Sequence, residues 1–93
     1  MTDNNNAMGR GQVSKLSAKI ELEYWCEIAE GNVEEWGLQD VETLLLAMQE
    51  EQGELAQAHL EAKHEDGDAA RIASELDDLA ALCIQLRWRL ERL

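Results

Sequence analysis

Two short acidic segments carry the residues best suited to chemistry. The first reads Glu-Glu-Gln-Gly-Glu over residues 50–54, and the second reads Glu-Leu-Asp-Asp over residues 75–78. Each holds two carboxylates three positions apart, which makes them neighbours on one face of a helix. Clustered carboxylates repel one another unless a cation lies between them, and oxygen-only ligands select hard cations such as Mg²⁺, with Mn²⁺ as a substitute. The candidate metal ligands are Glu51, Glu54, Glu75 and Asp78.

Two other interpretations of these residues stay open at this point. The chain has 20 acidic residues, so acidic pairs at helical spacing also arise by chance on a solvated face. A zinc site at His59 and His64 is a weaker alternative, because a spacing of five residues does not align two side chains on a helix. With about 100° per residue, each acidic pair falls on the shoulder of an apolar helix face, with Asp77 on the solvent side. Two such helices packed antiparallel would bring the pairs into one cleft.

Helical periodicity predicts the elements that must position these acids. A helix is expected over about 13–30, ended by Gly31-Asn32, and a connector follows to residue 39. A second helix is expected to about residue 63 after an Asp40 cap, and a third from residue 69 to the C-terminus after an Asp68 cap. The expected core stripes are Val13, Leu16, Ile20, Tyr24 and Ile28; Val41, Leu44, Leu45, Met48, Gln52, Leu55 and His59; and Ile72, Leu76, Leu79, Cys83, Leu86 and Leu90.

The fold class expected is all-α, a short antiparallel bundle of about three helices completed by oligomerisation. Residues 1–12 are polar and aperiodic, which predicts a disordered tail ahead of one helical domain over 13–93. Such a short chain buries only a modest core, so a homodimer or homotetramer is expected. The interface candidates are Leu22, Trp25, Leu46 and Trp88.

The charge balance limits the classes of molecule that this chain is expected to bind. A net charge of −12 argues against nucleic acid, which normally requires a basic face. The sequence shows no signal peptide and no apolar run of membrane-spanning length, so a cytoplasmic protein is expected. Cys26 and Cys83 are read as free thiols rather than a disulfide. The few Lys residues among many acids are compatible with a high-salt cytoplasm.

The two acidic segments resemble the MazG-like and all-α NTP pyrophosphohydrolases, which carry EExxE on one helix and ExxD on the next. Here the motifs are separated by 20 residues, and the resemblance extends over about residues 38–90. Flanking residues also match, with Leu-Leu-Leu-Ala-Met over 44–48 and Leu79 after the second motif. The resemblance implies that Glu51, Glu54, Glu75 and Asp78 bind Mg²⁺. It also implies cleavage of a nucleoside triphosphate to the monophosphate and pyrophosphate.

The resemblance assigns further roles. Glu50 corresponds to the first Glu of EExxE, which in some relatives assists a second metal or the attacking water. Lys63 and Arg71 are the nearby cations expected to contact substrate, and Trp36 could stack on a base, although a core or interface role is also expected for it.

Members of that family usually have a further helix with phosphate- and base-binding residues, whereas this sequence ends at Leu93. A non-catalytic dimeric module that binds Mg²⁺ or a nucleotide as a regulator therefore stays an alternative. A phosphoribosyl-ATP pyrophosphohydrolase is a third reading, placed last because no Lys-rich segment precedes the motif.

Overall fold

The computed structural model describes residues 14–64 and 68–93, which form three α-helices and no strand. They are α1 (Lys15–Trp36), α2 (Val41–His64) and α3 (Ala69–Leu90). The expectation of an all-α chain is therefore confirmed. The expected disordered tail over 1–12 lies outside the described residues. None of the described helices combines the length and apolar character needed to cross a bilayer.

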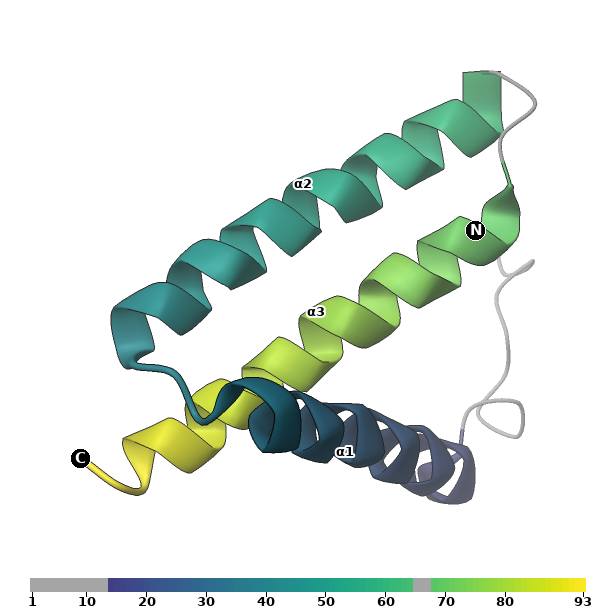
Figure 1. Ribbon diagram of the computed structural model, residues 1–93. Helices are drawn as coiled ribbons and strands as arrows, with labels where there is room; N and C mark the ends of the chain where they lie inside the picture. Colours follow the sequence, from purple (N-terminus) through teal and green to yellow (C-terminus); the bar gives the residue numbers. More distant parts are fainter. Residues whose placement is uncertain (1–13, 65–67) are drawn as a thin grey trace, which may run out of the picture.

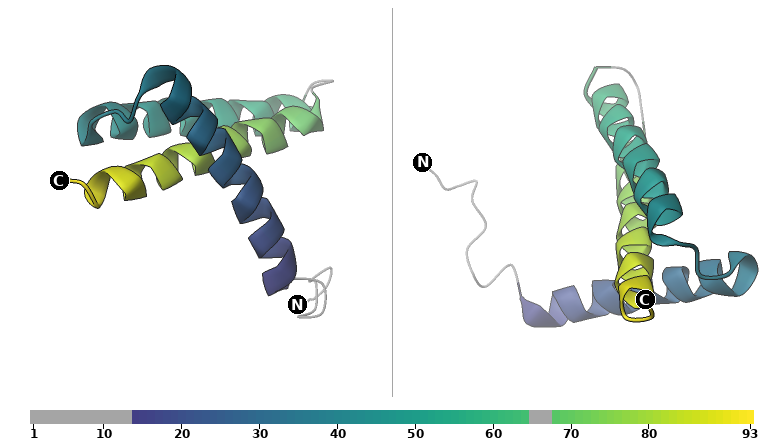
Figure 2. Two further views of the ribbon diagram at one scale, coloured as in Figure 1. Left: turned by 60° about the horizontal axis from the view of Figure 1, so that its bottom comes forward. Right: turned by 90° about the vertical axis from the view of Figure 1, so that its left-hand side faces the viewer.

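Helix α3 is the central element, because it packs against both of the others (Figures 1 and 2). Helix α2 leads away from the α1–α2 connector, and α3 returns beside it over most of its length. Helix α1 crosses α3 steeply, as the left view of Figure 2 shows. The chain has extents of 45 × 33 × 20 Å. The α2–α3 pair is thus the frame on which both acidic segments are placed.

The end of α1 differs from the sequence-based expectation. The helix continues through Gly31 and Asn32 and ends at Trp36, because Gly31 is tolerated inside a helix at a modest cost. The actual stop is Gly37, with φ 81° and ψ 162°, a region open essentially to glycine alone. The Gly37 N–H donates to the carbonyl of Val33 at 2.7 Å. The expected stop was wrong because another glycine six residues later supplies the turn.

These two glycines should respond to alanine in opposite directions. We expect Gly37→Ala to destabilise the fold by about 1–3 kcal/mol, because a Cβ strains the positive-φ backbone. Gly31→Ala should stabilise it by about 0.5–1 kcal/mol, since Gly31 is helical and a Cβ there meets nothing within 4 Å. Urea unfolding followed by circular dichroism measures both changes. Equal effects in the two variants would contradict this account of where α1 ends.

The starts of α2 and α3 confirm the expected caps. The Asp40 carboxylate accepts from the Thr43 N–H at 2.8 Å. The Asp68 carboxylate accepts from the Ala70 N–H at 2.9 Å. Each satisfies one of the free N–H groups at a helix start. The caps therefore fix the register with which α2 and α3 begin.

The α2–α3 contact is a heptad seam that agrees in part with the stripes expected from the sequence, since residues such as Leu44, Leu55 and Leu79 belong to both. Buried and half-buried positions recur at alternating spacings of three and four on each helix, as in coiled coils. On α2 they are Val41, Leu44, Met48, Glu51, Leu55, Ala58 and Ala62, and on α3 they are Ile72, Glu75, Leu79, Leu82, Leu86 and Arg89. Several residues assigned to the stripes are instead exposed, namely Leu45, Gln52, His59, Leu76, Cys83 and Leu90. One acid from each motif thereby occupies a core position.

The expected stripe of α1 was also largely wrong. Leu16, Ile20 and Tyr24 are 69%, 58% and 49% exposed. The buried residue of α1 is Ala29, and α3 contributes the fully buried Ala81. Both residues are small, and small residues let two helices such as α1 and α3 approach closely. Most large apolar side chains of α1 are on the surface, whereas Trp25 and Ile28 are half-buried.

Candidate metal centre

Three glutamates meet at the α2–α3 seam. Glu51 and Glu54 come from α2 and Glu75 from α3, and one carboxylate oxygen of each lies within 4.8 Å of the other two. Glu51 and Glu75 are half-buried, whereas Glu54 is exposed at the edge. The seam register produces this meeting, since Glu51 and Glu75 occupy heptad positions on facing helices. Three of the four acids predicted as ligands are thus brought together.

Two oxygens of this cluster are buried without a partner. Within the described residues, Oε2 of Glu51 and Oε2 of Glu75 are inaccessible to solvent and accept no hydrogen bond. A buried carboxylate normally requires a donor, an opposite charge or a metal, because desolvation of an unpaired charge is costly. The donor set is oxygen only, which suits Mg²⁺ or Mn²⁺ rather than Zn²⁺. The residues present therefore fit a hard divalent cation.

The electrostatics of the cluster centre on Glu51. The pKa of Glu51 is raised to about 7, chiefly by burial and then by the charges of Glu54, Asp78, Glu75 and Glu50. Near neutral pH, Glu51 is therefore on the boundary between its protonated and ionised forms. A cation bound among these carboxylates would favour the ionised form by offsetting their mutual repulsion.

Asp78 lies at the rim rather than inside the group. It is exposed, and its oxygens are not among those that lie within 4.8 Å of one another. Its pKa is nevertheless raised, first by burial and then by the charges of Asp77 and Glu54. Asp78 shares the field of the cluster, and its side chain lies on the same acidic edge as Glu54.

Asp77 is not on the solvent side, contrary to the sequence-based expectation. It is half-buried, and its Oδ1 accepts a hydrogen bond from Nε1 of Trp25 at 2.8 Å. This bond joins α1 to α3 one residue before Asp78. The sequence periodicity of α3 alone could not reveal it, because the second face of α3 is used by α1. Trp25, an expected interface residue, is thereby engaged within the chain.

The residues assigned to substrate are spread along α2 and its neighbours. Glu50 is exposed beside Glu51 and lines a surface hollow with Thr43, Leu46, Ala47 and Gln49. Trp36 is 68% exposed and borders a separate cavity at the end of α1. Neither Glu50 nor Trp36 belongs to the glutamate cluster itself.

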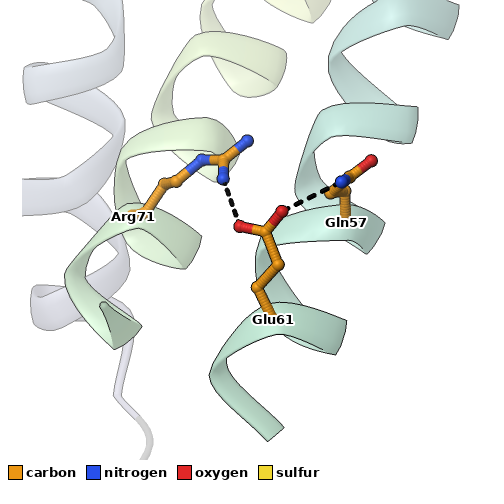
Figure 3. Close-up of polar contacts among 3 residues, drawn as sticks. All are labelled: Gln57, Glu61 and Arg71. Carbon is orange, nitrogen blue, oxygen red and sulfur yellow. Dashed lines mark hydrogen bonds and ion pairs between the residues drawn. The ribbon is translucent and has the colours of Figure 1, made fainter. Parts of the chain in front are cut away.

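The two expected substrate cations lie toward the other end of the α2–α3 pair. Nη1 of Arg71 contacts Oε1 of Glu61 at 2.6 Å, and Nε2 of Gln57 donates to the second oxygen of Glu61 at 2.9 Å (Figure 3). Arg71 therefore joins α3 to α2 through a partly exposed ion pair. Lys63 is exposed on the last turn of α2. The structure does not bring Lys63 or Arg71 to the cluster of Glu51, Glu54 and Glu75.

Sequence reasoning missed a polar lining beside the seam. Gln85 is only 3% exposed, and it lines the cavity near Trp36 together with Asn32, Gln39 and Thr43. The sequence feature that could have indicated this lining is Gln85 itself, a polar residue next to the seam residue Leu86. The two cysteines, by contrast, are free thiols as expected, although Cys83 is exposed rather than part of the core.

Comparison with protein-family models, with curated proteins and with solved structures finds no match for this chain.

Proposed function

We propose that this chain is a Mg²⁺-dependent nucleoside triphosphate pyrophosphohydrolase that releases a nucleoside monophosphate and pyrophosphate. The carrying observation is the cluster of Glu51, Glu54 and Glu75 at the seam, with two buried carboxylate oxygens that lack a donor within the described residues. Mg²⁺ retains waters and completes its coordination with substrate phosphates, so a partly open oxygen site suits phosphate chemistry. The resemblance of the two acidic motifs to MazG-like enzymes supports the same reading.

In this proposal the residues divide the work by position. Glu51, Glu54 and Glu75 hold the cation, and Asp78 contributes from the rim, directly or through a water. When bound, Mg²⁺, or Mn²⁺ in its place, would offset charge on the phosphate oxygens and lower the pKa of a coordinated water. Glu50 is exposed beside the cluster and would orient the attacking water and accept its proton. The water oxygen would form a bond to the α-phosphorus. The bond between the α-phosphorus and the oxygen that bridges it to the β-phosphorus would break, and pyrophosphate would leave.

The second candidate is a non-catalytic module that binds Mg²⁺ or a nucleotide as a regulator. It is favoured by the placement of the cations, because Arg71 is paired with Glu61 and the two hollows beside the cluster are lined without Lys or Arg. Phosphoryl transfer commonly uses such cations to stabilise developing charge. A site without them would bind more readily than it would catalyse.

Pyrophosphate release separates the two candidates. We expect the protein with Mg²⁺ to convert at least one member of a panel of ribo- and deoxyribonucleoside triphosphates to monophosphate and pyrophosphate, and EDTA to stop the reaction. The measurement is a coupled pyrophosphate assay with product identification by chromatography. Mg²⁺ binding without turnover over the whole panel would support the regulatory module. Absence of Mg²⁺ binding would refute the enzyme, and absence of both Mg²⁺ and nucleotide binding would refute both candidates.

We further propose that the bundle is completed by a homodimer or homotetramer. The exposed apolar residues include Leu22 on α1 and Leu46 on α2, at 50% and 59% exposure, which matches two of the four expected interface residues. Together with the exposed Leu16 and Ile20 at the start of α1, they are apolar surface that association would cover. We expect light scattering at micromolar concentration to give at least twice the mass of one chain. A monomeric mass in both low and high salt would contradict this.

A further inference from the structure

A cavity of about 410 Å³ opens where the end of α1 and the α1–α2 connector meet α2 and α3. Trp36 lies at one side, and Leu44 and Leu82 from the seam form an apolar floor. The remaining lining includes three side-chain amides and a hydroxyl, and no lining residue is charged. This volume is within the range of small-molecule sites. A lining without cationic side chains is poorly suited to phosphate and favours a neutral ligand with polar edges.

The polar groups of this cavity are held by the fold. Nε2 of Gln39 donates to the carbonyl oxygens of Trp36 at 2.7 Å and Gly37 at 3.3 Å. Gln85 is 3% exposed, and its recorded hydrogen bond is one long contact of 3.3 Å from Nε2 to the Ala81 carbonyl. A side-chain amide has two donor hydrogens and an acceptor oxygen. Gln85 therefore retains hydrogen-bonding capacity in a wall where polar groups are normally satisfied.

The cavity adjoins the hollow that reaches Glu50, because Thr43 and Ala47 line both. Ala47 is one helical turn, about 6 Å along the axis, before Glu51. A ligand with a planar neutral group at one end and phosphates at the other would place those phosphates beside the glutamate cluster.

We propose that this cavity is the nucleobase site, in which the base lies on the Trp36 indole and its polar edge meets Gln85 and Thr43. This inference rests on the proposed function and names the part of the substrate that the cavity recognises. An exposed indole offers a face for stacking that suits any base. The amides and the hydroxyl supply the donors and acceptors that a base edge requires, while the acidic cluster governs the phosphates.

Nucleosides and inorganic tripolyphosphate test the cavity and the glutamate cluster separately. Without metal, we expect at least one nucleoside of a panel to bind the parent protein, detected by saturation-transfer NMR. Trp36→Ala should weaken this binding about 5- to 100-fold. Thr43→Val, which removes a hydroxyl with little change of shape, should weaken it several-fold. Tyr24→Leu, which removes an exposed aromatic residue outside the cavity, should leave it unchanged.

Binding of Mg²⁺-tripolyphosphate reports the glutamate cluster alone. Trp36→Ala should leave this binding intact and raise the KM for the nucleotide, whereas Glu54→Gln should lose tripolyphosphate and keep nucleoside. If Mg²⁺-tripolyphosphate binds while no nucleoside does, and Trp36→Ala leaves nucleotide affinity unchanged, the base site is refuted but the metal site is not. Dissociation of the oligomer by Trp36→Ala, with nucleoside affinity retained, would assign the cavity to a subunit contact and also refute the proposal.

Discussion

Glu54→Gln is expected to abolish Mg²⁺ binding and pyrophosphate release while the fold persists. Glu54 contributes one of three carboxylate oxygens that lie within 4.8 Å of one another, and glutamine keeps its size but removes its charge. We expect affinity to fall more than about 100-fold, since losing even an outer partner of a metal ligand typically costs 10- to 100-fold. Glu54 is exposed, so the variant should fold. Calorimetry with Mg²⁺ and the pyrophosphate assay measure the two losses.

The matched control is Glu23→Gln, which removes the same charge from an exposed position on α1. It should change Mg²⁺ affinity little, and its stability by about 0.5 kcal/mol or less. Asp77 and Glu61 are unsuitable controls, because Asp77 accepts from Trp25 and Glu61 pairs with Arg71. Equal losses in Glu54→Gln and Glu23→Gln would show that only bulk negative charge attracts the cation. Unchanged Mg²⁺ affinity in Glu54→Gln would refute the proposed metal site.

Helix number and helix starts could be predicted because they depend on local chemistry. The caps at Asp40 and Asp68 require only a side-chain oxygen and a nearby free N–H. The end of α1 was harder, because Gly31 and Gly37 are both plausible stops and only Gly37 adopts a positive φ. Tertiary packing on α3, which the sequence does not state, favours the longer helix.

The helix faces could be predicted only in part from apolar periodicity. In the part of the chain that the structure describes, three of the four buried apolar residues are the small residues Ala29, Ala58 and Ala81, which a search for large apolar side chains passes over. Many leucines are exposed instead, so a stripe drawn through the largest apolar residues coincides with the seam at only some of its positions, such as Leu44 and Leu79. The same error placed Glu51 on the shoulder of its helix, when it occupies a seam position.

The candidate metal site was predictable in its residues but not in its grouping. The motif spacing brings together Glu51 and Glu54, and the register of the seam adds Glu75. The sequence could not show that Asp78 lies at the rim while Glu75 lies in the cluster, because the two residues are on one turn of α3. It also could not show that α1 uses the opposite face of α3, where Trp25 bonds Asp77.

Metal-free stability should fall as the pH rises toward 7, and Glu51 should be responsible for part of this fall. Its folded-state pKa of about 7 lies above the ordinary value of 4.5. Between these values the folded state holds a proton that the unfolded state has released, so stability decreases with pH in this window. Below about 4.5 this contribution is fully present, and above about 7 it is lost. The raised pKa of Asp78 acts in the same direction.

Glu51→Gln should therefore stabilise the metal-free protein at pH 8, because the neutral amide mimics the protonated acid. A gain on the order of 1 kcal/mol corresponds to a Tm increase of about 4–8 °C for a domain of this size. The gain should largely disappear at pH 4, where the acid itself is protonated. Glu23→Gln, which removes a charge elsewhere, should show little difference between the two pH values.

Mg²⁺ should reverse the order of stability, because the cation binds the ionised form of Glu51. We expect millimolar Mg²⁺ to raise the Tm of the parent protein more at pH 8 than at pH 6, since a ligand that binds only the folded state stabilises it more as its affinity increases. Glu51→Gln should show no such increase at either pH, although it is the more stable protein without metal. Thermal scans of both proteins with EDTA and with Mg²⁺ measure these shifts. A Mg²⁺-dependent increase of equal size in Glu51→Gln would mean that the cation binds elsewhere, because the seam site would then have lost one of its three glutamates without consequence.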